Sequence, residues 1–308
     1  MSRWTADQIP DQTGRTFLVT GANSGLGHET ARQLSLHGAQ VIMTARSEAK
    51  GRTAMAELTA GQPGASIELR LLDLSDLDSV RALAESLVAD RVQVDVLVNN
   101  AGIMMPPRSL TKQGFELQFA TNHLGHFALT GLLLETLAKG RDPRVVTVSS
   151  SLHRRGSIDF DDLTGERSYS PTRFYAQSKF ANVLFGLELD RRLRASGSPV
   201  RSLLAHPGYS ATNLQSSGPT GLLNLLGKVG NALMAQHVRM GALDQLYAAT
   251  APEAESGQFI GPDRLGESRG HPRVVQPVES AKDPETARRL WDVSEDLTGV
   301  RFPLPAPA

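Results

Sequence analysis

Residues 16–27 read TFLVTGANSGLG, and this stretch decides the fold. The apolar, β-branched run 16–20 predicts a short strand, and residues 28–36 after the glycines have a helical pattern. Glycine lets a backbone approach a ligand closely, and the free N–H groups of a helix N-terminus attract an anion. Because folds of this type bind nucleotides at the first strand-to-helix junction, the stretch predicts a phosphate-binding turn. The alternative is a turn without a ligand.

The remaining chain alternates short apolar runs with longer helical patterns, which is typical of βαβ units. We expect one α/β domain over residues 1–308, a Rossmann-type, doubly wound, parallel seven-stranded sheet with helices on both faces. Residues 1–14 are expected to form an N-terminal extension, and residues 262–308 a C-terminal extension packed on the domain. The expected strands are residues 16–20, 40–44, 67–72, 94–99, 144–149, 200–205 and 258–260. The expected helices include residues 25–37, 75–89 (capped by Ser75), 113–137, 174–194 and 284–297.

Composition excludes several classes of protein. The 308 residues include 32 basic (Lys plus Arg) and 32 acidic side chains and no cysteine. Balanced charge provides no positive field for nucleic acid, so no nucleic-acid partner is expected. Disulfides and thiolate metal sites are excluded, and the histidines lack metal-ligand spacing, so no metal is expected. The chain has neither a signal-like start nor an apolar stretch of about 20 residues, which favours a cytoplasmic protein over a membrane protein. A homo-oligomer remains open.

Tyr175 and Lys179 stand four residues apart at the start of a helical pattern. This spacing places them on one helix face, so both can point into one cleft. An ammonium beside the phenol is expected to lower the pKa of Tyr175 from about 10, which would permit proton exchange near neutral pH. The pair alone is a weak pattern. The functional interpretation of the pair is strengthened by its position, because it follows a predicted strand that ends in the hydroxyls of residues 149–151, at the ligand-binding edge of the sheet.

Three motifs resemble those of the short-chain dehydrogenase/reductase family and occur in the family's order. The glycine spacing differs from the G-x-G-x-x-G and G-x-x-x-x-G-K-[ST] fingerprints of other nucleotide-binding proteins. The resemblance covers about residues 14–212, and the strings TGANSGLG and NHLGHF (residues 122–127) are similar to the retinol-dehydrogenase-like branch. It implies hydride transfer between a nicotinamide dinucleotide and an alcohol or carbonyl carbon. The motifs are Thr20-Gly21-x-x-x-Gly25-x-Gly27, Asn99-Asn100-Ala101-Gly102 and Tyr175-x-x-x-Lys179.

The resemblance also implies catalytic roles. Tyr175 would give or take the proton, and Lys179 would also reach the nicotinamide ribose. Ser150 would hydrogen-bond the substrate oxygen, with Ser149 and Ser151 as competitors. Because Ser150 and Tyr175 are 25 residues apart (175 − 150), the loop 152–173 must bulge out, as a similar insertion does in the retinol-dehydrogenase-like branch.

Asn122, within the predicted helix 113–137, resembles the family residue that holds a water in a proton relay to the lysine. Asparagine has low helix propensity, so something should compensate for it. The alternative is an Asn whose side chain binds a neighbouring backbone segment.

The residues that the resemblance assigns to the dinucleotide follow the predicted strands. Asp73 resembles the adenine-contacting acid, with a plain loop aspartate as the alternative. The set comprises Gly21, Asn23, Ser24, Gly25, Leu26 and Gly27, then Arg46, Asp73, Leu74, Asn100, Ala101, Gly102, Tyr175, Lys179, Pro207, Gly208 and Thr212.

The end of the second strand predicts which dinucleotide binds. An acidic residue there suits the free 2′-hydroxyl of NAD, whereas arginine suits the 2′-phosphate of NADP. The strand ends in Met43-Thr44-Ala45-Arg46-Ser47, without a carboxylate. Arg46 can make charge-assisted, forked contacts with phosphate, which favours NADP(H) over NAD(H). The alternative is a solvated Arg46.

Residues 213–240 form a candidate substrate lid, because they follow the Pro-Gly turn and are rich in leucine and glycine. Contact with a membrane surface and plain core packing are the alternatives. The apolar side chains suggest a small apolar substrate, either a carbonyl compound that NADPH reduces or the alcohol that is oxidised in the reverse direction, and we expect activity in the direction from NADPH to the carbonyl. A noncatalytic dinucleotide-binding redox sensor is the rival function, but its mark would be loss of Tyr175 or Lys179. Sugar-nucleotide epimerisation is disfavoured by the glycine spacing and by the lack of a large C-terminal substrate domain.

Overall fold

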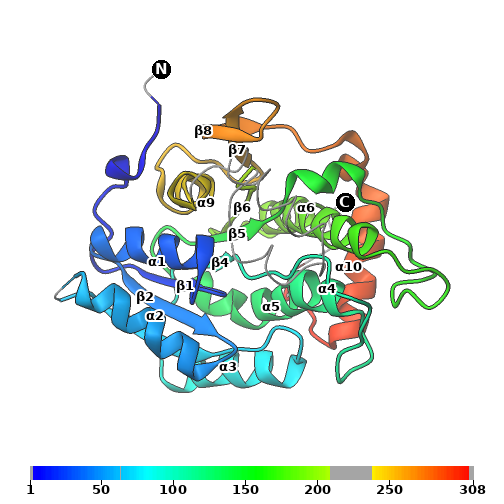
Figure 1. Ribbon diagram of the computed structural model, residues 1–308, viewed down its shortest axis with the longest axis horizontal. Helices are drawn as coiled ribbons and strands as arrows, with labels where there is room; N and C mark the ends of the chain where they lie inside the picture. Colours follow the sequence, from blue (N-terminus) through cyan, green and yellow to red (C-terminus); the bar gives the residue numbers. More distant parts are fainter. Residues whose placement is uncertain (1–2, 63, 209–237, 305–308) are drawn as a thin grey trace, which may run out of the picture.

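The computed structural model of the protein describes residues 3–62, 64–208 and 238–304, and its centre is a twisted sheet between two layers of helices (Figure 1). The strands follow the order β3-β2-β1-β4-β5-β6-β7-β8, and all neighbours are parallel except β7 and β8. Between β1 and β4 the winding direction reverses, which is where such sheets bind nucleotides. The strands are β1 (Thr16–Val19), β2 (Gln40–Ala45), β3 (Ile67–Leu71), β4 (Val96–Asn99), β5 (Arg144–Val148), β6 (Arg201–Ala205), β7 (Phe259–Arg264) and β8 (Arg269–Val275).

The helices connect successive strands or follow the last one. Pro171 begins the longest described helix, where the absence of an N–H costs nothing, and the Ser170 side chain caps its first turn. The helices are α1 (Gly25–Leu36), α2 (Glu48–Ala60), α3 (Leu77–Ala89), α4 (Leu117–Phe119), α5 (Gly125–Leu137), α6 (Pro171–Ala195), α8 (Val238–Gly241), α9 (Leu243–Thr250) and α10 (Pro284–Thr298). Shorter turns are the 3₁₀ helices η1 (Ala6–Gln8), η3 (Ser151–Arg155) and η5 (Glu279–Lys282) and the π-helical turn η2 (Ala120–Leu124).

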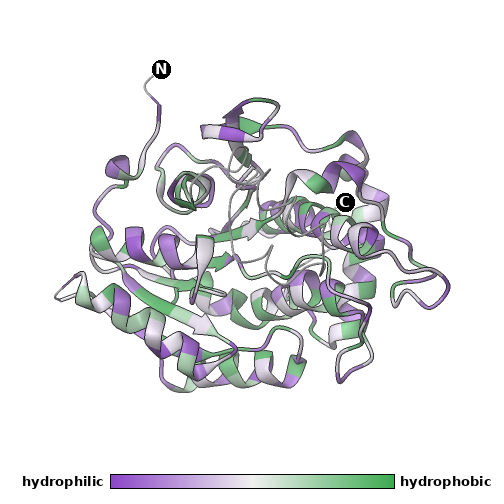
Figure 2. Cartoon of the chain, in the orientation of Figure 1, coloured by the Kyte–Doolittle hydropathy of each residue, from purple (hydrophilic) through white to green (hydrophobic). Residues whose placement is uncertain are grey.

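Alternating side chains of each buried strand feed two separate cores, because successive residues of a strand point to opposite faces. Phe17 and Val19 of β1 join the core that α1, α2 and α9 cover. Leu18, between them, joins the core that α3, α5 and α6 cover. The strands are therefore apolar on both faces, and Figure 2 shows this as green along the central strands, while the helices carry both colours.

The sheet has eight strands, so the prediction of seven was one too few. The last predicted strand, residues 258–260, is the start of a longer β7, and an antiparallel β8 pairs with it. The sequence of β8, Arg-Gly-His-Pro-Arg-Val-Val, has little β-propensity in its first five residues, and the pairing shifts register between Pro262 and Arg264. The rest of the predicted fold class is confirmed, since the sheet is otherwise parallel and covered on both faces.

Two predicted helices differ from the structure for local reasons. The helix expected over residues 113–137 is interrupted by the π-helical turn η2, which contains Asn122. The helix expected to begin with a cap at Ser75 has Asp76 as its cap, because the Asp76 side chain accepts a hydrogen bond from the amide of Asp78. Ser75 instead donates its hydroxyl to the Asp73 carboxylate at 2.5 Å.

The described segments near the two ends of the chain pack on the helices that cover the sheet. Trp4 and Ile9 of the N-terminal segment are buried, and the Trp4 ring meets the edge of the Tyr247 ring on α9 at 5.4 Å. Near the other end, Leu290 and Trp291 of α10 are buried against the core next to α6. Across the described ranges, no helix combines the length and apolar character that a membrane span requires.

Candidate active site

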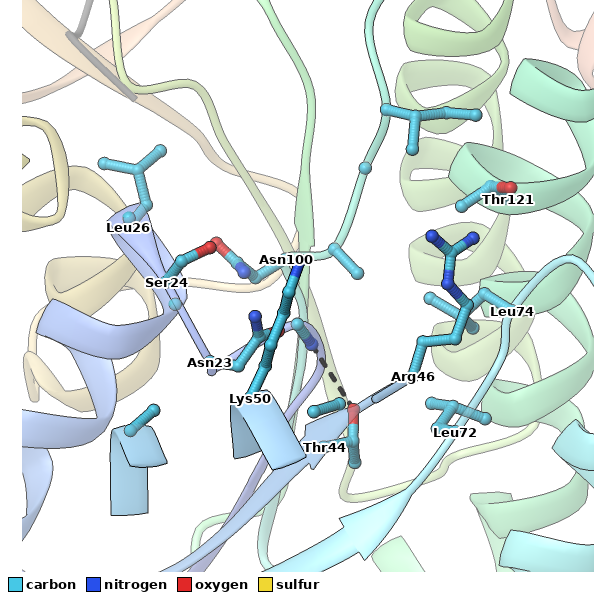
Figure 3. A pocket seen from close by; sticks show the side chains of 18 of the residues that line it. Asn23, Ser24, Leu26, Thr44, Arg46, Lys50, Leu72, Leu74, Asn100 and Thr121 are labelled. Carbon is cyan, nitrogen blue, oxygen red and sulfur yellow. Dashed lines mark hydrogen bonds between the residues drawn. The ribbon is translucent and has the colours of Figure 1, made fainter. Parts of the chain in front are cut away.

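A cavity of about 850 Å³ opens at the carboxyl ends of β1, β2, β4 and β5 (Figure 3). It brings together residues that the sequence separates by more than 150 positions, from the glycine turn to the start of α6. The predicted site residues that line it are Gly21, Asn23, Ser24, Gly25, Leu26, Gly27, Arg46, Asp73, Leu74, Asn100, Ala101, Gly102, Tyr175, Lys179 and Pro207. The cavity is also lined by Ser149, which was named as a competitor of Ser150. Lining residues that were not predicted include Thr44, Ala45, Ser47, Lys50, Leu72, Ile103, Thr121 and Val148.

The glycine turn has the conformation that glycine is needed for. Gly21 and Gly25 have positive φ angles of 64° and 58°. A Cβ on Gly27 would lie 2.5 Å from Nδ2 of Asn100 and 2.6 Å from the carbonyl oxygen of Gly21, so no side chain fits there. The Ser24 side chain makes no capping hydrogen bond to α1, which leaves the first-turn amides available to an anion. This cradle suits the pyrophosphate of a dinucleotide.

Thr20 joins the glycine turn to the turn after β4. Its hydroxyl accepts hydrogen bonds from the amides of Asn100 and Ala101, both at 2.9 Å. The Asn100 side chain donates to the Thr20 carbonyl oxygen at 2.8 Å. The two turns that the resemblance assigns to the dinucleotide therefore form one hydrogen-bonded wall of the cavity.

Arg46 and Lys50 place two positive charges at the end of the cavity next to β2. Figure 3 shows both side chains reaching into it from the end of β2 and the start of α2. Nearby Arg52 pairs with Glu48 at 2.6 Å, whereas Arg46 and Lys50 pair with no carboxylate within the described ranges. The dashed line in Figure 3 is a hydrogen bond of 3.3 Å from the Gly21 amide to Thr44, which holds the glycine turn beside β2.

Asp73 lies in the cavity wall, but one of its carboxylate oxygens is committed locally. Oδ1 accepts from the amide of Ser75 at 2.9 Å and from its hydroxyl at 2.5 Å. The Asp73 amide in turn donates to the Ser79 hydroxyl at 3.0 Å. The loop after β3 is thus held rigidly, with Leu72 and Leu74 beside Asp73 offering an apolar surface to the cavity.

Tyr175 and Lys179 face the same cavity from α6, as their spacing predicts. Both are buried, and the Lys179 ammonium lies 5.9 Å from the centre of the Tyr175 ring. Nζ of Lys179 donates to the carbonyl oxygen of Val148 at 3.2 Å, which anchors it to the end of β5. The pair is therefore positioned by the sheet as well as by its own helix.

The electrostatics of the pair differ from the prediction that Lys179 lowers the pKa of Tyr175. Burial raises the pKa of Tyr175 to about 12, against the opposing effect of a hydrogen bond with Ser150. Burial also lowers the pKa of Lys179 to about 8. The prediction was wrong in sign because desolvation of the phenolate outweighs an ammonium nearly 6 Å from the ring. Near neutral pH Tyr175 is a neutral phenol, ready to donate its proton.

The two serines that follow β5, Ser149 and Ser150, have different hydrogen-bond partners. Ser150 is the hydroxyl that bonds Tyr175, and its side chain also accepts from the Leu152 amide at 3.3 Å. Ser149 lines the cavity, but its hydroxyl donates to the carbonyl oxygen of Lys179 at 2.8 Å. The partnership with Tyr175 favours Ser150 over Ser149 as the serine that meets a substrate oxygen.

Asn122 is fully occupied by its neighbours. Its Oδ1 accepts from the amide of Ile103 at 2.8 Å, and its Nδ2 donates to the Ile103 carbonyl at 3.0 Å and to the Ser178 hydroxyl at 2.9 Å. This is the contact with a neighbouring backbone that the sequence left open. Gly102 leaves room for it, because a Cβ there would be 3.2 Å from Asn122 Oδ1 and 3.4 Å from Lys179 Nζ.

The turn after β6 completes the described part of the site. Pro207 lines the cavity, and Gly208 has a positive φ of 61° that suits glycine. Thr212 and residues 213–237 of the candidate lid lie outside the described residues. In the parts of the chain that the structure describes, no three His, Asp or Glu side chains cluster as metal ligands would.

A sequence profile described as short chain dehydrogenase matches residues 15–221, so the protein belongs to the short-chain dehydrogenase family. It is an NAD(P)-dependent oxidoreductase acting on alcohol or carbonyl groups, of the retinol-dehydrogenase-like branch. The chain is 41% identical to human (Homo sapiens) retinol dehydrogenase 14 over 304 residues, which cover 93% of this chain and 87% of that protein.

Two solved structures agree with this assignment. An uncharacterised Mycobacterium paratuberculosis protein is 45% identical with a TM-score of 0.81, and the match covers 98% of this chain and 100% of that one. A Beutenbergia cavernae protein assigned as an NAD(P)-dependent gluconate 5-dehydrogenase, with bound NADP, is 25% identical with a TM-score of 0.64 over 80% of this chain and 94% of that one.

Proposed function

We propose that the protein reversibly transfers hydride between NADP(H) and an apolar carbonyl or alcohol, with Tyr175 as the acid and base. The observation that carries this proposal is that Tyr175 and Lys179 share one cavity with the glycine turn and Arg46. The bound dinucleotide supplies or accepts the hydride. The protein supplies the proton, the orientation of both reactants and protection from water.

In the reducing direction the neutral phenol of Tyr175 donates its proton to the substrate oxygen as negative charge forms on it. The Ser150 hydroxyl, which bonds Tyr175, would hydrogen-bond the same substrate oxygen. Lys179, which is anchored on Val148, holds positive charge beside the phenolate that remains. In the oxidising direction Tyr175 takes the alcohol proton back.

Arg46 and Lys50 support NADP(H) as the preferred dinucleotide. Two cations without carboxylate partners in the described chain face the end of the cavity next to β2. A 2′-phosphate would neutralise them through charge-assisted hydrogen bonds, whereas a bare ribose hydroxyl would not. The Beutenbergia cavernae structure, which has bound NADP, is consistent with this preference.

The substrate class is proposed from the relatives and from composition. The name of the human relative is that of an enzyme acting on retinol, an apolar alcohol. Residues 213–240, which follow the cofactor turn, are rich in leucine and glycine, as a cover over an apolar substrate would be.

The test is a panel of apolar aldehydes, ketones and alcohols, assayed by nicotinamide absorbance with NADPH and NADH separately. We expect turnover of an apolar carbonyl with NADPH, at a higher kcat/KM than with NADH. A kcat/KM for NADH equal to or above that for NADPH would refute the dinucleotide preference. NADP(H) binding without turnover of any panel member would favour the redox-sensor alternative.

A further inference from the structure

The hairpin of β7 and β8 touches two loops that border the cavity. Glu267 lies in the turn of this hairpin, and its Oε2 is 3.2 Å from Nε2 of His206, the residue before Pro207. The same oxygen is 2.8 Å from a guanidinium nitrogen of Arg154, on the turn η3 that follows Ser150. One carboxylate therefore bridges the segment after β5 and the segment after β6.

The hydrogen bonds of His206 define its proton arrangement. The amide of Gly208 donates to Nδ1 at 3.3 Å, so Nδ1 is an acceptor. Nε2 then carries the proton and donates it to Glu267. Because the ring is completely buried, Glu267 fixes the imidazole and the imidazole fixes the Pro207–Gly208 turn.

Glycines on both sides make this fit tight. A Cβ on Gly261 of β7 would clash with Nε2 of His206. A Cβ on Gly208 would lie 2.5 Å from the carbonyl oxygen of Ser268 in the hairpin. The turn after β6 is therefore seated directly on the hairpin backbone, and its position depends on the position of the hairpin.

Glu267 adopts an unfavourable backbone conformation in order to make these contacts. Its φ of 66° is in the left-handed region, which is costly for a residue other than glycine, asparagine or aspartate. The hydrogen bond from His206, together with Arg154, lowers the pKa of the Glu267 carboxyl to about 2. The side chain is thus a stable anion at any pH at which the enzyme would be assayed.

A second histidine ties the serine loop to the segment after the hairpin. Nδ1 of His153 donates to the Ser150 carbonyl oxygen at 2.7 Å, and its Nε2 accepts from the Val278 amide at 3.3 Å. The His153 and His206 rings both pack on Phe259 of β7, at 5.3 and 5.2 Å between ring centres. The hairpin thus supports both segments independently of Glu267, which adds the only charged bridge described between them.

We propose that Glu267 is a positioning residue, whose carboxylate fixes the position of the Pro207–Gly208 turn relative to the Ser150 loop at the nicotinamide side of the cavity. This inference rests on the proposed function, because dinucleotide binding and hydride transfer are the activities that would depend on the relative position of the two segments. Glu267 touches neither reactant, so its effect reaches them through His206 and Arg154.

Amide hydrogen exchange of the protein without dinucleotide tests the bridge itself. Glu267→Gly removes the carboxylate and relieves the left-handed strain, so we expect the variant to stay folded while residues 201–208 and 151–156 exchange faster. Glu267→Gln keeps an acceptor for His206 and should lie between Glu267→Gly and the wild type. Glu279→Gln is the matched control, because Glu279 forms an exposed pair with Lys282 outside the site. Unchanged exchange of both segments in Glu267→Gly would overturn the proposal.

Dinucleotide binding and kinetics test the consequence. We expect Glu267→Gly to raise the NADPH dissociation constant roughly tenfold and to lower kcat/KM by roughly ten- to a hundredfold, the usual effect of a small misplacement. Glu267→Gln should recover part of both losses. If only the melting temperature changed, with binding and kinetics within about twofold of wild type, Glu267 would be a structural residue and the proposal would fail. A wild-type protein that binds neither dinucleotide would refute the proposed function, while the exchange result would still decide the bridge.

Discussion

Nε2 of His126 lies 2.9 Å from the hydroxyl of Thr20, and this hydrogen bond joins α5 to the residue that precedes the glycine turn. Burial lowers the pKa of His126 to about 4, so the ring is neutral near pH 7. Its Nδ1–H donates to the carbonyl oxygen of Asn122 at 3.1 Å, which leaves Nε2 to accept from Thr20. One imidazole therefore connects the glycine turn and the π-helical turn η2.

Replacement of His126 by Phe should weaken both stability and dinucleotide binding. The aromatic ring fills the space, but it removes the donor to the Asn122 carbonyl and leaves the Thr20 hydroxyl with the longer bond to the Val98 carbonyl oxygen, at 3.3 Å. Each buried polar group left unsatisfied costs roughly 1–3 kcal/mol, so we expect a lower midpoint in urea unfolding and a higher NADPH dissociation constant. His37→Gln is the control, because His37 caps the C-terminal end of α1, opposite the end that begins in the glycine turn. An unchanged midpoint would show that His126 only fills space.

Three buried histidines should make the protein sensitive to acid. Burial lowers the pKa of His123 to about 3 and of His126 and His153 to about 4, from about 6.5. At a pH between the folded-state pKa values and the unfolded-state value of about 6.5, the unfolded chain binds protons that the folded chain does not. The free energy of unfolding therefore falls as the pH decreases from about 6.5 to about 4, by up to about 1.4 kcal/mol per pH unit for each histidine. Urea unfolding at several pH values measures this. His126→Phe should reduce the slope by about one proton, and an identical slope would contradict the assignment.

The sequence predicted what depends on local pattern, and missed what depends on the packing of distant segments. The glycine turn and the pair Tyr175 and Lys179 were correctly placed in one cavity, because their spacings act within one turn or one helix. The raised pKa of Tyr175 was missed, since burial comes from the whole fold. Glu267 gave no signal either, because it follows a glycine in a loop and its partners are 61 and 113 positions away.

Tyr175→Phe should strongly reduce turnover but not dinucleotide binding. The change removes the proton donor and leaves the aromatic packing, so kcat should fall about 100-fold or more while the NADPH dissociation constant stays near wild type. Tyr247→Phe is the matched control, because Tyr247 lies on α9 beside Trp4 and does not line the cavity. Comparable kcat values for Tyr175→Phe and the wild type would refute the proposed mechanism.

Arg46→Ala should change the choice of dinucleotide. Loss of a charge-assisted contact of roughly 1.5–3 kcal/mol predicts a decrease in kcat/KM for NADPH of about ten- to a hundredfold. The kcat/KM for NADH should stay near wild type, since NADH has no 2′-phosphate. Arg52→Ala, which breaks only the exposed pair with Glu48, controls for the loss of one positive charge on this side of the protein. Equal losses with the two dinucleotides would remove Arg46 from the 2′-phosphate site.

Asp142→Asn should cause a large loss of stability far from the cavity. Asp142 pairs with Arg15 at 3.4 Å, with Arg144 at 2.7 Å and with Arg201, and the Arg144 side chain is only 1% exposed. Burial alone would raise the pKa of Asp142, but the arginines hold it below its usual range. Asparagine tolerates the positive φ of 53° at this position, so the substitution removes charge without adding backbone strain. Because it leaves a buried guanidinium without its counter-ion, we expect a loss of about 3–5 kcal/mol in urea unfolding. Asp78→Asn, which breaks an exposed pair with Lys112, should cost less than about 1 kcal/mol, and equal losses in the two variants would show that burial of Arg144 does not govern the effect.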